Sequence, residues 1–135
     1  MRSRLLALAG VAAALAVAFA IRAVDDGALR QYSGTALYAS MIYAGVFVLR
    51  PRTTPLVAGA VAIAWCWAVE LAQLTGVPAE LSARSLLARY ALGVKFDPAD
   101  LAWYPVGVVP LVVAHLLFRR RKFHAVTRQD TLAGR

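Results

Sequence analysis

The sequence predicts an all-α integral membrane protein, a four-helix bundle with one short helix at its outer surface. Composition is the first reason: 61% of the 135 residues are hydrophobic and only 16% are charged, which is too apolar for a soluble domain. The second reason is that four apolar runs are close to the length that crosses a hydrocarbon core of roughly 30 Å. These runs cover residues 5–24, 35–49, 55–77 and 101–118, the second being short.

The first run has features of a secretory signal peptide, namely a basic start, an apolar core and a small-x-small triplet at 18–20. Because the apolar stretch continues to Val24, we expect this segment to be retained as a helix. Gly10, Ala14 and Ala18 recur at every fourth position, a spacing that lets a neighbouring helix approach closely. The first run is therefore predicted to be a packing helix.

The basic residues predict how the chain is oriented in the membrane. With the amino terminus inside, ten of the fifteen basic residues are cytoplasmic and six of the seven acids are outside, as the positive-inside rule requires. We therefore expect a multi-pass protein of the cell membrane with both termini cytoplasmic, one transmembrane domain over 1–118 and a basic tail over 119–135. The basic cluster at 119–122 is expected to hold the last helix beside lipid head groups, and no nucleic-acid partner is expected.

Cysteine and histidine usage argues against metal or disulfide chemistry. Cys66 is the single cysteine, which excludes an intramolecular disulfide and leaves too few ligands for a structural zinc site. His115 and His124 lie at and beyond the end of the fourth run, where we interpret them as a buried neutral side chain or a tail residue. No metal and no cofactor is expected.

The most informative stretch is the third run, where Thr54 and Pro55 are suited to cap and start a helix. Six residues spaced by alternate threes and fours share one face of this helix. The side chains on this face are small at the predicted inner end and polar at the predicted outer end. They are Gly59, Ile63, Cys66, Glu70, Gln73 and Val77. An ionisable side chain deep in a bilayer costs roughly 2.5 to 3.5 kcal/mol, so Glu70 requires a partner, water or a proton.

A partner for Glu70 is sought in the more polar segment after Pro78, which is predicted to form a short outer helix that ends at Gly93. Arg84 is the natural candidate, because a guanidinium pairs bidentately with a carboxylate. The alternative, an exposed arginine that contacts lipid phosphates, remains open. Asp97 is expected to cap the fourth helix, with Asp100 either in its first turn or facing Arg84.

The outer end of the second run supplies two further candidates. Residues 25–27 are typical of a turn, and an outer loop is expected to run through Arg30 to Gly34. Tyr38 falls near the outer interface, where tyrosine hydroxyls commonly lie among head groups, and a ligand contact is the alternative. The other aromatic residues of the outer half are interpreted as lipid, helix or interface contacts; they are Trp65, Trp67, Trp103 and Tyr104.

An ordered set of motifs runs along the chain, each of them unspecific alone. It consists of Arg30-x-Tyr32-x-Gly34 with Leu37-Tyr38, Glu70-x-x-Gln73, Arg84, Leu92-Gly93-x-x-Phe96 and Asp100-x-x-x-Tyr104-x-x-Gly107. The set resembles the small bacterial membrane proteins grouped as domain of unknown function 2809, over about residues 5–118. More distantly, the order Glu-x-x-Gln, Arg and Asp is similar to VanZ-like proteins, a group associated with teicoplanin resistance. The first family has an acid after Gly34 where this chain has Thr35, which puts an acid-dependent role of that loop in doubt.

Neither resemblance implies an established reaction, and two classes of function remain open. The favoured class is a non-enzymatic membrane protein that binds an envelope lipid, a lipid-linked precursor or a partner protein at an outer polar cluster. The contacts would be Glu70, Gln73, Arg84, Asp100, Tyr38 and Arg30. The alternative is a small intramembrane enzyme with Glu70 or Asp100 as general acid or base. No nucleophile–base pair, metal set or phosphate loop is recognisable, which favours binding; an oligomer remains open.

Overall fold

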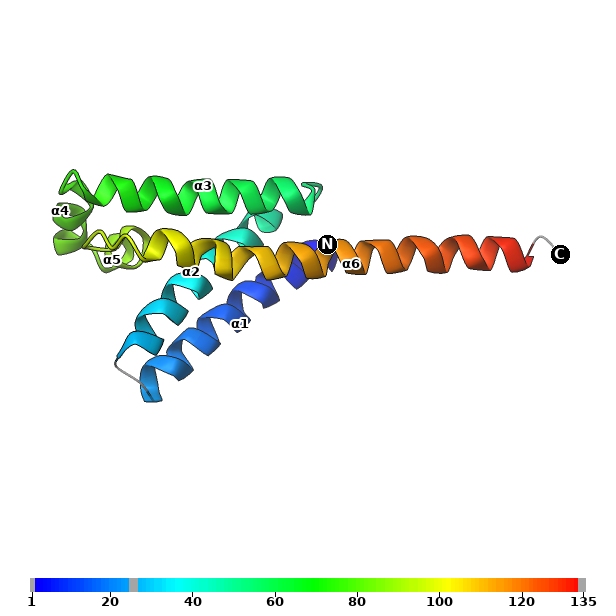
Figure 1. Ribbon diagram of the computed structural model, residues 1–135, viewed down its shortest axis with the longest axis horizontal. Coiled ribbons are helices and arrows are strands. Elements are labelled where there is room, and N and C mark those ends of the chain that lie inside the picture. Colours follow the sequence, from blue (N-terminus) through cyan, green and yellow to red (C-terminus); the bar gives the residue numbers. More distant parts are fainter. Residues whose placement is uncertain (1, 25–26, 134–135) are drawn as a thin grey trace.

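The computed structural model describes residues 2–24 and 27–133, with side chains placed for 5–21, 23–24 and 27–119. Six helices form within these residues, so the predicted all-α class is confirmed (Figure 1). They are α1 (Arg2–Val24), α2 (Ala28–Leu49), α3 (Pro55–Gln73), α4 (Val77–Arg84), α5 (Leu86–Leu92) and α6 (Asp100–Ala133). Three segments are long and apolar enough to cross a membrane, namely α2, α3 and residues 100–119 of α6. The described apolar part of α1, Leu5–Ile21, is shorter.

The helices form two antiparallel pairs that cross obliquely. In Figure 1, α3 and α6 run side by side along the long axis, while the hairpin of α1 and α2 crosses them at a large angle. The short helices α4 and α5 lie at the end where α3 stops and α6 starts. Among the described residues, α2, α3 and α6 contact one another, whereas α1 contacts α2 and no other helix.

The centre of the bundle is packed with small residues. Ala39, Ala58, Ala62 and Cys66 have no exposed surface, and each comes from α2 or α3. At Gly107 the backbones of α2 and α6 come so close that an added Cβ would overlap the carbonyl oxygen of Ala36. Small side chains at a crossing allow this approach. Larger buried residues, among them Tyr43, Phe47 and Val108, complete the core.

The third helix starts as predicted and ends earlier. Pro55 is its first residue, and the Thr54 hydroxyl accepts a hydrogen bond of 3.4 Å from the backbone N–H of Val57. The predicted run to Val77 is wrong, because α3 stops at Gln73 and Val77 begins α4. Gly76 causes this break: its φ of 78° is left-handed, a conformation that glycine adopts without a Cβ clash.

The segment after α3 contains two short helices where the sequence predicted one. Ser85 lies between them in an extended conformation, ends α4 and caps α5 by accepting from the N–H of Ala88 at 3.3 Å. Gly93 ends α5 as predicted, with φ 67° and ψ −170°, a region that is essentially open to glycine alone.

The second helix is longer than predicted, because the expected loop through Arg30 to Gly34 is the first part of α2. The hydroxyls in this stretch bond back to the helix. Ser33 donates to the Leu29 carbonyl, and the Thr35 hydroxyl, which has a single proton, lies 3.1 Å from the Gln31 carbonyl oxygen. Polar residues that signal a loop in the sequence are thus satisfied within a helix.

The last helix also extends beyond its predicted limits of 101–118, since its backbone remains helical to Ala133 through most of the predicted tail. The side chains of the basic cluster at 120–122 and of His124 lie outside the described ones. Pro105 cannot donate to the carbonyl of Leu101, and the indole N–H of Trp67 fills that place at 3.0 Å.

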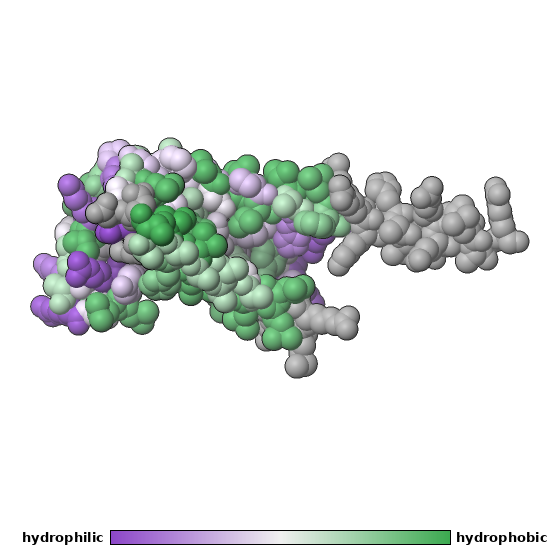
Figure 2. Space-filling view, turned by 90° about the horizontal axis from the view of Figure 1, so that it is seen from below, coloured by the Kyte–Doolittle hydropathy of each residue, from purple (hydrophilic) through white to green (hydrophobic). Residues whose placement is uncertain are grey.

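The surface follows the same division of polar and apolar residues. Figure 2 shows hydrophobic residues over the flanks of the helices, while hydrophilic residues gather at the end where α4 and α5 lie. Many large apolar side chains are exposed, for example Leu56 at 64% and Trp65 at 51%. Such flanks fit hydrocarbon better than water.

Candidate functional site

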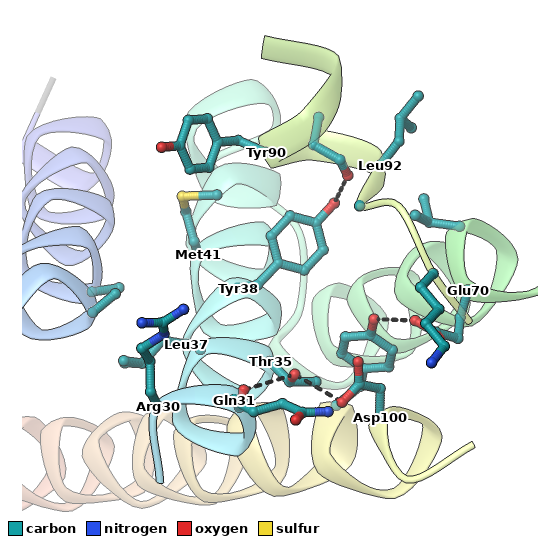
Figure 3. Close-up of a pocket in the computed structure, with 18 of the residues that line it drawn as sticks. Arg30, Gln31, Thr35, Leu37, Tyr38, Met41, Glu70, Tyr90, Leu92 and Asp100 are labelled. Atoms are coloured by element: carbon teal, nitrogen blue, oxygen red, sulfur yellow. Dashed lines mark hydrogen bonds between the residues drawn. The ribbon is translucent and has the colours of Figure 1, made fainter. Parts of the chain in front are cut away.

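Polar side chains from α2, α3, α6 and the loop before α6 meet at one end of the bundle (Figure 3). Glu70 is at the centre and is 1% exposed. One of its oxygens accepts from the backbone N–H of Asp97 at 2.6 Å, and the other accepts from the Tyr104 hydroxyl at 2.7 Å. A buried carboxylate is tolerated when donors surround it, so Glu70 fastens α3 to the start of α6.

The expected pair between Glu70 and Arg84 is wrong. Arg84 is exposed on α4 and does not line the pocket described below, while both oxygens of Glu70 bond elsewhere. The break at Gly76 explains the difference, because it separates α4 from the axis of α3 and changes the face on which Arg84 lies. The alternative interpretation of Arg84, an exposed arginine, agrees with its position.

Two side chains of α2 bind the acids at the start of α6. Gln31 donates to one carboxylate oxygen of Asp97 at 2.6 Å, and Thr35 donates to Asp100 at 2.9 Å. The other oxygen of Asp97 accepts from the N–H of Ala99 at 2.9 Å, the local turn that its predicted capping role requires. Where the resemblance led one to expect an acid, Thr35 thus supplies a hydroxyl donor to an acid.

The end of α5 is held by three side chains from three other helices. Tyr38, Gln73 and Ser82 donate to the carbonyls of residues 91, 92 and 93, each at 2.7 Å. The last carbonyls of a helix lack partners within it, so these bonds complete α5. The Tyr38 hydroxyl is therefore directed at the protein, where it also accepts from the indole of Trp65 at 3.3 Å.

These contacts frame a pocket of about 1110 Å³ between the two helix pairs. Its polar lining includes Arg30, Gln31, Thr35, Glu70, Gln73, Lys95 and Asp100, and its apolar lining includes Leu15, Phe19, Leu37, Met41 and Val69. Five of the six predicted site residues line it: Arg30, Tyr38, Glu70, Gln73 and Asp100. Arg84 is the one that does not. The Gln73 side-chain oxygen is buried and has no hydrogen-bond partner among the described residues.

Four residues of this region were not recognised as site residues in the sequence. Gln31 falls in the predicted loop and Thr35 at the start of the second predicted run, so their helical spacing of four, which places them on one face, was not recognised. Tyr104 was interpreted as part of an aromatic belt, although the resemblance includes it. Lys95 carries no signal of its own, because its place in the pocket depends on how the loop between α5 and α6 folds.

The other end of the bundle holds a second, smaller polar contact. The Tyr43 hydroxyl lies 3.1 Å from Nδ1 of His115, and Phe47 packs on both rings. His115 is half-buried, in accordance with the predicted buried histidine. Among the described side chains, no group of three histidines, cysteines or acids is placed to hold a metal ion.

The two acids at the polar end are both bonded to other parts of the chain. Glu70 accepts one hydrogen bond on each oxygen and is 1% exposed, so both of its oxygens hold parts of the chain in place. Asp100 likewise holds Thr35. The acids fix the walls of the pocket, and the pocket itself offers polar groups beside an apolar surface.

Comparison with known proteins gives one finding. Residues 24–108, more than half of the chain, match the family model described as a protein of unknown function, DUF2809. The match includes the pocket walls of α2, α3 and α5 and the start of α6. No curated protein and no solved structure matches the chain.

Proposed function

We propose that this chain, which belongs to the DUF2809 family of proteins of unknown function, is a multi-pass membrane protein that binds an amphipathic envelope lipid or lipid-linked precursor. The site is the pocket at the polar end of the bundle. The observation that carries this proposal is the composition of one continuous pocket, which joins charged and amide side chains to apolar ones.

The size and lining of the pocket fit such a ligand. Pockets for small molecules typically have volumes of about 300 to 1,000 Å³, so about 1110 Å³ accommodates a large head group together with part of a chain. The apolar lining from α1, Leu15 and Phe19, matches hydrocarbon, while Gln31, Lys95 and their neighbours match a polar head. A water-soluble ligand would gain little from exposed Phe19.

The proposal includes four crossings, with α1 as the first, and both termini in the cytoplasm. The uneven distribution of basic residues supports this orientation. It places the polar pocket and the helices α4 and α5 at the outer face, where envelope lipids and their precursors are available.

Cysteine labelling tests this orientation in a chain whose own cysteine has been replaced, Cys66→Ala. Ala83→Cys, on exposed α4, should react with an impermeant thiol reagent added to intact cells. Arg52→Cys, in the exposed turn between α2 and α3, should react only after the membrane is opened. Labelling of Arg52→Cys alone in intact cells would show that the orientation is the opposite of the proposed one.

Native mass spectrometry of the detergent-purified protein tests the binding. The wild type should retain lipid, and Ala18→Trp should lose it, because Ala18 lines the pocket and an indole there fills space next to α2. Leu15→Trp, at a second lining position, should have the same effect.

Ala16→Trp is the matched control, since Ala16 is exposed on α1 and does not line the pocket. It should retain lipid as the wild type does. Equal retention in all four proteins would contradict a pocket-bound lipid and would leave only lipid on the outer flanks.

A further inference from the structure

We infer that the ligand is a phosphate-bearing lipid, with its phosphate at Lys95 and its hydrocarbon chain leaving the pocket sideways between α1 and α5. This inference rests on the proposed function, because it names the class of ligand for the same pocket. Two independent observations support it, one on charge and one on the shape of the opening.

The charge observation concerns the ionic residues of the pocket. Glu70 and Asp100 hold donors from within the chain, and Arg30 also has an interaction within the chain. Lys95 lines the pocket, is exposed and has no ion pair or hydrogen bond among the described residues. It is therefore a pocket cation that is available to a ligand, and an ammonium group is a point charge well suited to a phosphate.

The position of Lys95 strengthens this assignment. It lies between Gly93, whose backbone conformation is fixed, and Asp97, whose N–H and carboxylate are bonded to Glu70 and Gln31. The backbone on both sides of Lys95 is thus held by hydrogen bonds while its side chain is not. A cation presented in this way at a pocket wall recognises an anion without first breaking a protein contact.

The opening is bounded by α1 and α5. Residues of both helices line the pocket, yet α1 contacts only α2 among the described helices. Figure 3 shows α1 at one side and α5 at the top, with Tyr38 and Met41 of α2 as the floor between them. Among the described helices, α1 and α5 do not contact each other, and we place the opening to the flank of the bundle between them.

The side chains at this opening are apolar or amphipathic. Phe19 on α1 is 61% exposed and Tyr90 on α5 is 66% exposed, and both line the pocket. On the flank of a membrane protein such an opening faces lipid, so a chain can pass from the bilayer into the pocket without crossing water. The hydrocarbon chain of a lipid fits this apolar path, whereas a free phosphate has no apolar part that would contact it.

Photolabelling of the full-length protein in a maltoside detergent, which carries no phosphate, tests the inference. The probe is phosphatidic acid with a diazirine in one chain, and the comparison probe is diacylglycerol with the same chain. We expect phosphatidic acid to label peptides of α1 around Phe19 and of α5 around Tyr90. Lys95→Gln should lower this labelling about threefold to fivefold, the effect of one exposed ion pair.

Arg89→Gln is the matched control, because Arg89 is exposed in the same outer segment, carries the same charge and does not line the pocket. It should leave labelling unchanged. An equal loss in Arg89→Gln and Lys95→Gln would overturn the inference, since it would show general attraction to a basic surface. Unlabelled phosphatidic acid should abolish labelling, whereas inorganic phosphate should not; full protection by inorganic phosphate would assign the site to free phosphate.

The comparison probe separates this inference from the proposed function. If diacylglycerol labels the same peptides as strongly as phosphatidic acid, and Lys95→Gln changes neither, the pocket binds lipid but does not recognise phosphate. If neither probe labels α1 or α5, the proposed function and the inference both fail.

Discussion

The two halves of the bundle are held together in different ways. In the central half, α2, α3 and α6 pack around small residues such as Ala39, Ala62 and Cys66, with Tyr43, Phe47 and Val108 in the same core. At the polar end the same helices are joined by directed hydrogen bonds between side chains, with Glu70 accepting two of them. Close packing sets the distance between the helices, whereas the hydrogen bonds set the position of individual polar groups.

This difference shows where a site can exist in a small membrane bundle. Close packing of small residues leaves no cavity, whereas hydrogen bonds between longer side chains hold helices apart around the pocket. The bonds from Tyr38 and Gln73 to the end of α5 illustrate this. They keep α5, which forms one pocket wall, about one side-chain length away from α2 and α3. Packing therefore stabilises the fold, while the polar network shapes the site.

Loss of Glu70 should have the largest effect. Glu70→Ala leaves the Asp97 N–H and the Tyr104 hydroxyl without their acceptor, at about 1 to 3 kcal/mol for each unsatisfied donor, so the unfolding free energy in detergent should fall by about 2 to 6 kcal/mol. Tyr104→Phe should cost less, and the double variant should be less destabilised than the sum, by about 1 to 2 kcal/mol.

Arg84→Gln gives the control cycle, because Arg84 is exposed and does not contact Glu70. Its effect should add to that of Glu70→Ala within about 0.5 kcal/mol. Strong coupling of Glu70 to Arg84, with none to Tyr104, would contradict the network described here.

The close packing of α2 against α6 is tested by Gly107→Ala. The added Cβ overlaps the Ala36 carbonyl oxygen, so α2 and α6 must separate, and overpacking of this kind costs about 1 to 3 kcal/mol. Gly45→Ala, on α2, meets nothing within 4 Å and should be neutral or slightly stabilising. Equal unfolding free energies for the two variants would contradict the close approach of α2 and α6 at Gly107.

Much of the fold follows from the sequence, because apolar runs and capping residues are local signals. The start of α3 at Thr54 and Pro55 and the end of α5 at Gly93 are of this kind. The start of α2 was missed, since Ser33 and Gly34 resemble loop residues, and only the structure shows that the Ser33 hydroxyl bonds to the helix.

The site was predicted less completely than the fold. The sequence shows that Glu70 needs a partner, because the cost of its burial is a general property of membranes. Which partner it finds depends on how the chain turns at Gly76 and how α6 starts, and no local pattern specifies that Asp97 and Tyr104 are closer than Arg84. Lys95 was missed for the same reason.

The central claim is that lipid binds at the polar end and that packing in the central half does not determine this binding. The most direct test is whether a packing variant and a pocket variant affect lipid binding differently. The measurement is the shift of the melting temperature when a polar lipid extract is added to the detergent-purified protein. A ligand at ten times its dissociation constant stabilises the folded state by about 1.4 kcal/mol, so the wild type should melt at a higher temperature. Gly59→Ala, whose added Cβ would lie 2.6 Å from the Val112 side chain and outside the pocket lining, should melt lower at the start and keep the full upward shift. Ala18→Trp should lose the shift. An equal shift in Ala18→Trp and in the wild type would contradict the pocket as the lipid site.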